Sequence, residues 1–236
     1  MRVVSLAPSA TATVAALGGA DRLVGVTHHD DADAHKVGGW LNPDYDAVAD
    51  RDPDVVLTSD PLQRDVRDAL RDRGFDVAHH EPGTLEAVLA SFAAVGDAVG
   101  LPDAGADLEA ASRERVATVR ERAPADGPVV YCEEWDDPPM AAGNWVPDVV
   151  AAAGGRYPFV DAGERSREVD AGEVRGADPD HAVVHVCGKG DRVDADPADR
   201  WGLDADVHVV DDSLLNQPSP RLLDGLELLA DRIRGD

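Results

Sequence analysis

The chain has 236 residues, a length that fits one large domain or two small lobes, and 43% of the residues are hydrophobic, which is enough to form a real core. It carries 47 acidic against 22 basic residues, for a formal net charge of −25. This balance excludes nucleic acid as an expected partner, because no basic stripe is available to neutralise phosphates. Acidic residues spread along the whole chain are typical of a salt-loving source, where salt screens their mutual repulsion.

The first hundred residues alternate between short apolar runs and amphipathic segments. The expected strands cover residues 2–6, 23–26, 55–58 and 75–78, and the expected helices cover residues 11–17, about two turns after Pro43, 62–73 and 84–99. This alternation predicts a parallel sheet with helices on both faces.

A single long helix is expected over residues 103–123. Pro102 suits its start and Pro124 its end, and a narrow apolar stripe that includes Leu108, Val116 and Val119 runs along one side. At about 1.5 Å per residue this helix would extend roughly 31 Å. Such a helix, as the sole connector of two lobes, would allow only small lobe rotations, so we expect a largely preformed cleft.

The second half repeats the order of the first. Val129 lies 126 residues after Val3, and Pro179 lies 126 residues after Pro53. The expected strands cover residues 128–132, 182–186 and 207–210, and the expected helices cover residues 146–153 and 221–233. We therefore predict two similar α/β lobes, at 1–100 and 125–236, joined by a backbone helix at 101–124.

The strand-end loops are the expected ligand site, because ligands of open parallel sheets bind beyond the carboxyl ends of the strands. Aromatic residues make up only 4% of the chain, yet Trp40, Trp135 and Trp145 fall in loops at or after expected strand ends. Indoles in such places suit a flat or polycyclic ligand. The alternative is that these indoles cap the cores of the lobes.

Signatures of catalysis are absent from the sequence. It contains no GxSxG, HExxH, GxxxxGK[ST] or GxGxxG motif, and Glu133 and Glu134 are better interpreted as a charged loop than as an acid–base pair. Cys132, Cys187 and His28 could together hold zinc, copper or cobalt, although their spacing is not specific and buried cysteine is often inert packing.

Several segments resemble the class III periplasmic binding proteins of ABC importers. The resemblance rests on SLAPSAT at residues 5–11, VGVTH at 24–28, VGGW at 37–40 and DPDVV at 52–56. YCEEW at residues 131–135, PPM at 138–140, GNW at 143–145, and DDSLLN at 211–216 with Pro220 and Arg221 are similar to the cobalamin-binding branch of that family. The resemblance covers essentially the whole chain.

The resemblance implies a non-enzymatic, monomeric binding protein with two α/β lobes, a rigid connecting helix and a ligand in the cleft. The implied ligand is cobalamin, a related corrinoid or another metal chelate, and the implied partner is an ABC permease. Carried over by position, the ligand contacts are Ser9, His28, Trp40 and Asp60 in the first lobe and Trp135, Trp145, Asp212, Asn216 and Arg221 in the second.

An ABC importer's binding protein works outside the cytoplasm, but no apolar leader or lipidated cysteine follows Met1. As written, the sequence predicts a cytoplasmic protein without membrane insertion, or an extracytoplasmic one if a leader has been trimmed. An alternative function is an intracellular carrier of metal or tetrapyrrole, or a chelatase-like enzyme that uses Cys132, Cys187 and His28. A scaffold that has lost its ligand is the third possibility.

Overall fold

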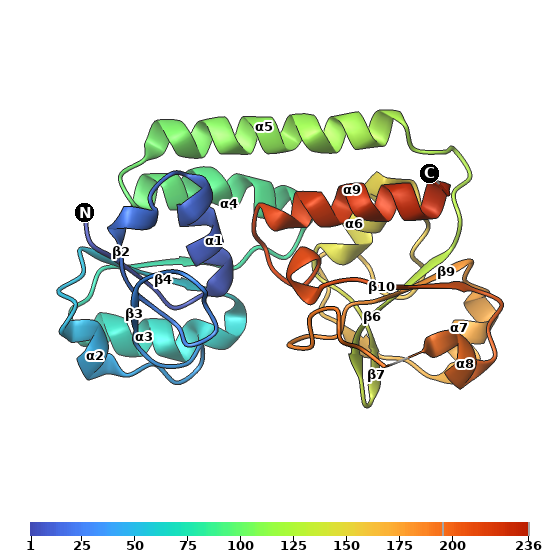
Figure 1. The fold of residues 1–236 in the computed structure, drawn as a ribbon, viewed down its shortest axis with the longest axis horizontal. Coiled ribbons are helices and arrows are strands. Elements are labelled where there is room, and N and C mark those ends of the chain that lie inside the picture. Colours follow the sequence, from blue (N-terminus) through green and yellow to red (C-terminus); the bar gives the residue numbers. More distant parts are fainter. Residues whose placement is uncertain (195, 236) are drawn as a thin grey trace. The chain divides into compact units, whose positions relative to one another are not determined.

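The computed structural model describes residues 1–194 and 196–235. The chain divides into two compact units, one of Met1–Pro82 with Leu89–Ala111 and the other of Gly83–Val88 with Ser112–Asp236. The long helix α5 (Pro102–Glu121) begins at the expected proline and gives residues to both units (Figure 1). The domain boundaries drawn from the sequence, with the helix as a separate segment, stay a prediction.

The first unit contains a five-stranded sheet in the order β3-β2-β1-β4-β5, and every neighbouring pair is parallel. Its strands are β1 (Val3–Ser5), β2 (Leu23–Val26), β3 (His35–Lys36), β4 (Val55–Ser59) and β5 (Val77–His80). The parallel direction places all five carboxyl ends at one edge, as the alternation in the sequence predicts.

Helices cover both faces of this sheet (Figure 1). They are α1 (Pro8–Ala16), α2 (Tyr45–Ala49), α3 (Arg64–Asp72) and α4 (Leu85–Ala98), with short 3-10 turns η1 (Ala20–Arg22) and η2 (Pro61–Gln63). Val3 packs in the same cluster as residues of α1 and α4, whereas Val4 packs with residues of α2 and α3. This follows from strand geometry, because successive side chains point to opposite faces.

The second unit contains a mixed sheet in the order β10-β9-β6-β7-β8. Its strands are β6 (Val130–Asp136), β7 (Pro139–Ala141), β8 (Arg167–Glu168), β9 (His181–Val184) and β10 (Asp206–Val209). The pairs among β10, β9 and β6 are parallel, whereas β7 runs antiparallel to both β6 and β8. The chain therefore departs here from the expected all-parallel sheet, because β6 turns back directly into a hairpin.

Two pairs of helices flank the second sheet (Figure 1). They are α6 (Val146–Ala153) with α9 (Arg221–Arg234) on one side, and α7 (Ala171–Ala177) with α8 (Pro197–Trp201) on the other, and the 3-10 turn η3 (Asp212–Leu214) follows β10. An aromatic cluster forms the core beneath α7 and α8, where the ring of Tyr131 lies 5.2 Å from that of Phe159 and 5.5 Å from that of Trp201, centroid to centroid.

Several expected boundaries are wrong. The strand expected at 75–78 runs from Val77 to His80, and the strand expected to end at Cys132 continues to Asp136, so Glu133, Glu134 and Trp135 lie in β6 and not in a loop. The short elements β3, β7, β8, α7 and α8 were not expected. No helix among the described residues is both long enough and apolar enough to cross a bilayer.

Candidate functional site

The carboxyl ends of the first sheet are tied together by Gln63, a fully buried side chain at the end of η2. Its Nε2 donates to the carbonyls of Leu6 at 2.9 Å and Trp40 at 2.7 Å, and its Oε1 accepts the amide of Ser59 at 2.7 Å. One amide group thus joins three chain segments that follow or end strands. This clamp fixes the backbone beneath the half-buried indole of Trp40.

Asp60 lies at the same edge, with a backbone φ of 77°, in the left-handed region that a residue other than glycine seldom adopts. Its amide donates to the carbonyl of His80 at 3.0 Å, and its Oδ1 accepts the amide of Leu62 at 2.8 Å. These bonds hold the turn from β4 into η2 against the end of β5. The structure therefore places the predicted residues Trp40 and Asp60 on neighbouring segments of one strand-end edge.

His28 and Ser9 complete the predicted set of the first unit. The imidazole of His28 is exposed, and its amide donates to the carbonyl of Gly38 at 2.9 Å, which holds the loop after β2 against the segment that leads to Trp40. Ser9 is buried in the first turn of α1, directly after the end of β1. His28 is the accessible member of this pair.

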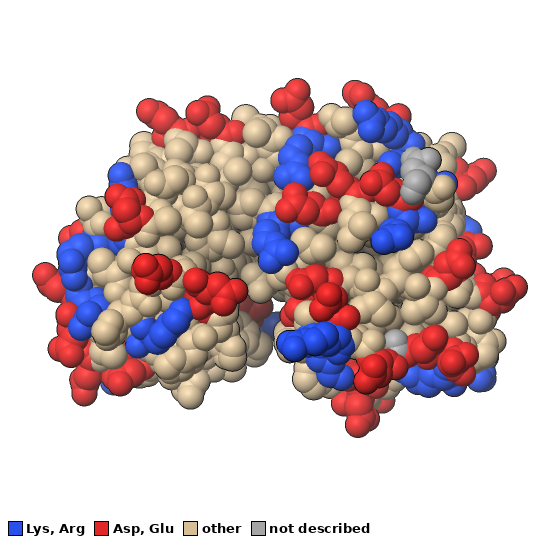
Figure 2. Space-filling model, viewed as in Figure 1, with Lys and Arg blue, Asp and Glu red and all other residues tan. Residues whose placement is uncertain are grey.

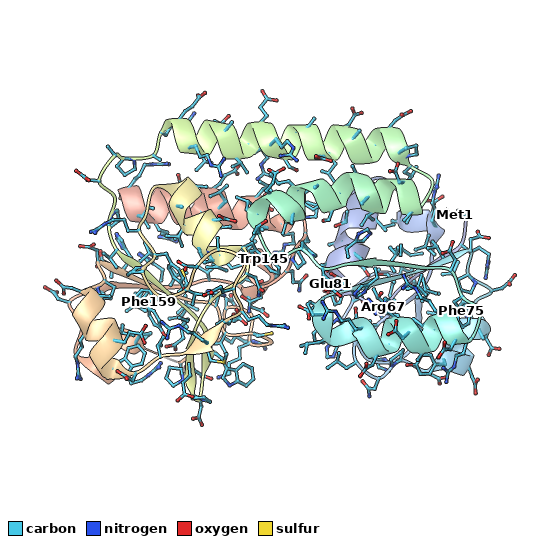
Figure 3. The ribbon with its side chains drawn as sticks, turned by 180° about the vertical axis from the view of Figure 1, so that it is seen from behind. Met1, Arg67, Phe75, Glu81, Trp145 and Phe159 are labelled. Carbon is cyan, nitrogen blue, oxygen red and sulfur yellow. The ribbon has the colours of Figure 1, made fainter. Side chains whose placement is uncertain are left out.

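A row of hydrogen-bonded polar side chains runs from β4 through β5 to Glu81, the residue directly after β5; Glu81 is labelled in Figure 3. Thr58 Oγ1 lies 2.8 Å from His79 Nδ1, and His79 Nε2 lies 2.8 Å from Glu81 Oε1. Arg64 pairs with the Glu81 carboxylate and, by hydrogen bond and charge, lowers the pKa of Glu81 to about 2. The order hydroxyl, imidazole, carboxylate looks like a catalytic triad, but Thr58 is fully buried, so the row braces the strands and presents no nucleophile.

Two tryptophans of the predicted site lie in very different surroundings in the second unit. Trp135 is 43% exposed on β6, and its Nε1 donates to the carbonyl of Asp137 at 2.9 Å. Trp145 is only 6% exposed at the start of α6, and its Nε1 donates to the carbonyl of Leu215 at 2.7 Å (Figure 3). Trp135 is therefore the indole available for stacking, whereas Trp145 joins α6 to the segment after η3.

Asp212 and Asn216 organise the loops at the end of β9. The two carboxylate oxygens of Asp212 accept the amides of Gly188 at 2.8 Å and Gly190 at 3.1 Å. The side-chain Nδ2 of Asn216 donates to the carbonyl of His185 at 2.9 Å, and its Oδ1 pairs with His185 Nδ1. The structure thus brings these two predicted residues to one loop cluster, where their bonds shape the backbone.

His185 is buried completely, and among the described residues its Nε2 has no hydrogen-bond partner. The bond to the Asn216 oxygen places the proton on Nδ1, so Nε2 carries a lone pair. Burial lowers the pKa of His185, which keeps the ring neutral near neutral pH.

Arg221, the last residue of the predicted set, is the exposed first residue of α9. Within the described part of the chain, its guanidinium has no hydrogen-bond or ion-pair partner. It is therefore free to bind a polar or anionic group of a ligand.

The residues predicted for a metal site lie on different elements, and this site stays a prediction. Cys132 is fully buried in β6, and burial raises the pKa of its thiol. Cys187 is an exposed residue after β9, but partial desolvation of its sulfur, together with the nearby carboxylates of Asp212 and Glu134, raises its thiol pKa as well. Neither is therefore a ready thiolate ligand. His28 lies in the first unit. Over residues 1–194 and 196–235, no group of three or more His, Cys, Asp and Glu side chains is arranged to hold a metal ion.

Sequence reasoning missed Gln63 and His185. Gln63 looks like an ordinary residue of an exposed helix, since its partners are 57 and 23 positions away along the chain. His185 gave a weak signal, as a polar residue inside an otherwise apolar strand run. An isolated polar residue in a buried run requires a partner, and here that partner is Asn216.

Comparisons with known proteins agree over nearly the whole chain. The model of the family described as "Periplasmic binding protein" matches residues 3–206. A "Cobalamin-binding protein" of Halobacterium salinarum is 28% identical, over 97% of this chain and 68% of the relative. A "Vitamin B12-binding protein" of Vibrio cholerae is 25% identical, over 96% of this chain and 86% of the relative.

Solved structures show the same fold. The periplasmic vitamin B12-binding protein BtuF of Vibrio cholerae superposes with a TM-score of 0.81 at 22% identity, covering 99% of this chain and 96% of that chain. The periplasmic heme-binding protein RhuT from Roseiflexus superposes with a TM-score of 0.79 at 23% identity, covering 99% of this chain and 98% of that chain. Proteins with different ligands share this fold, so the fold alone does not select the ligand.

Proposed function

The chain belongs to the periplasmic binding protein family, in the class III branch that serves ABC importers, and we propose that it binds cobalamin or a related corrinoid. The observation that carries the proposal is the match to relatives named for cobalamin and vitamin B12, which extends over 96–97% of this chain. We also propose that it delivers this ligand to a permease and performs no chemistry on it.

The surfaces at the strand ends support a corrinoid. A corrin ring has broad faces and a rim of amide groups, so it calls for indole surface together with hydrogen-bonding side chains. Trp135 offers an exposed indole in the second unit, and the half-buried Trp40 offers another in the first. The exposed Arg221 and the half-buried Asp60 add polar groups suited to amides.

The chelatase-like alternative receives less support from the same residues. Thiolates bind metals, but burial raises the thiol pKa of both Cys132 and Cys187 and so favours the protonated form. Insertion of a metal also calls for several ligands around one ion. Cys132 is sealed inside β6, where an incoming metal has no access to its sulfur.

A fluorescence titration tests the proposal. Cyanocobalamin is added to the protein in high salt, with a parallel titration of free tryptophan to correct for the ligand's own absorbance, and hemin serves as the competing ligand. We expect saturable quenching by cyanocobalamin and a weaker response to hemin. Trp135→Phe should lower the affinity about 2- to 10-fold, the worth of one stacking contact. A folded protein without saturable quenching, or with tighter binding of hemin, would refute the proposal.

A further inference from the structure

A cavity of about 440 Å³ lies within the second unit, next to the end of β6 and the segment that leads from β9 to α8. Its lining residues are Asp136, Lys189, Arg192, Asp194 and Arg200. Because β6 and β9 are parallel, this is the carboxyl-end edge of their sheet, the edge at which ligands of α/β folds bind.

The lining is unusual for so acidic a chain. Figure 2 shows acidic side chains scattered over the visible face between broad uncharged areas, with basic side chains interspersed and no extended basic stripe among the residues described there. The chain has 47 acidic and 22 basic residues, yet the cavity brings together three cations and two carboxylates. Basic residues are scarce in this chain, so three of them around one cavity are notable. Asp136 and Glu133 neutralise two of them, which leaves Arg192 as the cation that can receive an anionic group.

Two of the three cations are held in place by carboxylates. Lys189 Nζ lies 2.6 Å from Asp136 Oδ2. The guanidinium of Arg200 donates to both oxygens of Glu133, at 2.8 and 2.9 Å, and Glu133 is fully buried behind it. The third cation, Arg192, is exposed, and its side chain has no partner in the part of the chain that the structure describes. Arg192 therefore retains all of its donors for a ligand.

The arrangement suits a substituted phosphate. A guanidinium fork matches the geometry of phosphate oxygens, and a second cation beside it adds charge without competing for the same hydrogen bonds. The volume lies in the range of small-molecule pockets and exceeds what a single inorganic phosphate fills. A phosphate carried on a larger molecule can therefore enter the cavity.

We propose that Lys189, Arg192 and Arg200 form a subsite for the phosphodiester group of the corrinoid ligand. This inference rests on the proposed function. Cobalamin carries a phosphodiester in its nucleotide loop, whereas cobinamide lacks the nucleotide loop and the phosphate. The subsite would therefore make the protein selective for complete corrinoids over those without the loop.

Calorimetric titration with cyanocobalamin and with dicyanocobinamide tests the subsite. We expect wild-type protein to bind cyanocobalamin about 10-fold more tightly, as one charge-assisted contact implies. Arg192→Gln should bring the ratio of the two affinities close to one. Arg122→Gln is the matched control, because Arg122 is also exposed, has no side-chain partner among the described residues and lies outside the cavity lining, so the ratio should stay at the wild-type value.

Two further measurements sharpen the test. Asp194→Asn removes a negative charge from the lining and should raise the affinity for cyanocobalamin without changing that for dicyanocobinamide. Added salt should reduce the ratio in wild-type protein, because screening weakens an exposed charge contact.

The outcomes separate this subsite from the proposed function. If neither corrinoid binds, the proposed function fails and the subsite fails with it. If both bind with equal affinity, or if Arg192→Gln and Arg122→Gln leave the same ratio, the subsite is refuted and the corrinoid-binding function stands.

Discussion

Replacement of Gln63 by leucine is the most direct perturbation of the strand-end edge in the first unit. The leucine side chain fills a similar volume but breaks all three hydrogen bonds of the buried amide group. It leaves the carbonyl of Leu6 and the amide of Ser59 without these partners in a buried environment. Each orphaned buried group costs about 1–3 kcal/mol, and a carbonyl tolerates the loss better than an amide, so we expect a total destabilisation of about 3 kcal/mol.

Chemical denaturation in high salt measures the loss in free energy of unfolding of Gln63→Leu, and Gln217→Leu is the matched control. Gln217 is half-buried, and its side chain has no hydrogen-bond partner among the described residues, so its replacement should change the free energy of unfolding by no more than about 0.5 kcal/mol. Hydrogen exchange locates the effect. In Gln63→Leu the amide of Ser59 should lose more protection than that of Val56, which donates to Asp76 at 2.8 Å within the strand pairing.

The clamp explanation is wrong if the two glutamine variants are equally stable. It is also wrong if the amides of Ser59 and Val56 lose protection in parallel, because that result would indicate a general loosening of the sheet. A selective loss at Ser59 together with weaker cobalamin binding would show that Gln63 positions the segment of Trp40.

Three further changes have defined outcomes. Arg64 lowers the pKa of Glu81 to about 2, so the ionised Glu81 should stabilise the fold fully above about pH 4.5, and this stabilisation should disappear as the pH falls toward 2. In acid denaturation, Glu81→Gln should lack this pH dependence of stability. A Glu81→Gln profile that matches the wild-type profile would refute the assignment. Arg200→Ala leaves the buried Glu133 carboxylate without its cation, with the Tyr131 hydroxyl still donating to it at 2.9 Å, and should cost about 3 kcal/mol in thermal or denaturant unfolding. A loss below about 1 kcal/mol would mean that the ion pair is dispensable. Trp145→Phe removes one buried hydrogen bond and should cost about 1 kcal/mol, and unchanged stability with lost cobalamin quenching would show instead that this indole contacts the ligand.

The sequence predicts the central strands of both sheets well. Val3, Val55 and Val130 belong to short apolar runs bounded by proline or glycine, and buried parallel strands have this pattern. The long helix is equally clear, because Pro102 marks its start. These features are local, so they can be read without knowledge of the fold.

The features that the sequence does not reveal depend on distant partners. Glu133 and Glu134 suggest a charged loop, yet β6 continues through both, since Arg200 neutralises the first from 67 positions away and Ser166 donates to the second at 2.6 Å. The hairpin from β6 to β7 is not evident in the sequence either, because the strand that leads into it is stabilised by these distant partners. The different surroundings of Trp135 and Trp145 are also invisible in the sequence, because both indoles follow similar polar segments and only packing distinguishes them.

The most direct test of the central claim is isothermal titration of cyanocobalamin into the folded protein at high salt. Corrinoid binding predicts a saturable heat signal with one ligand per chain and a measurable loss of affinity in Trp135→Phe. A protein whose circular dichroism shows a folded chain, but which gives no saturable heat with cyanocobalamin, would contradict the claim.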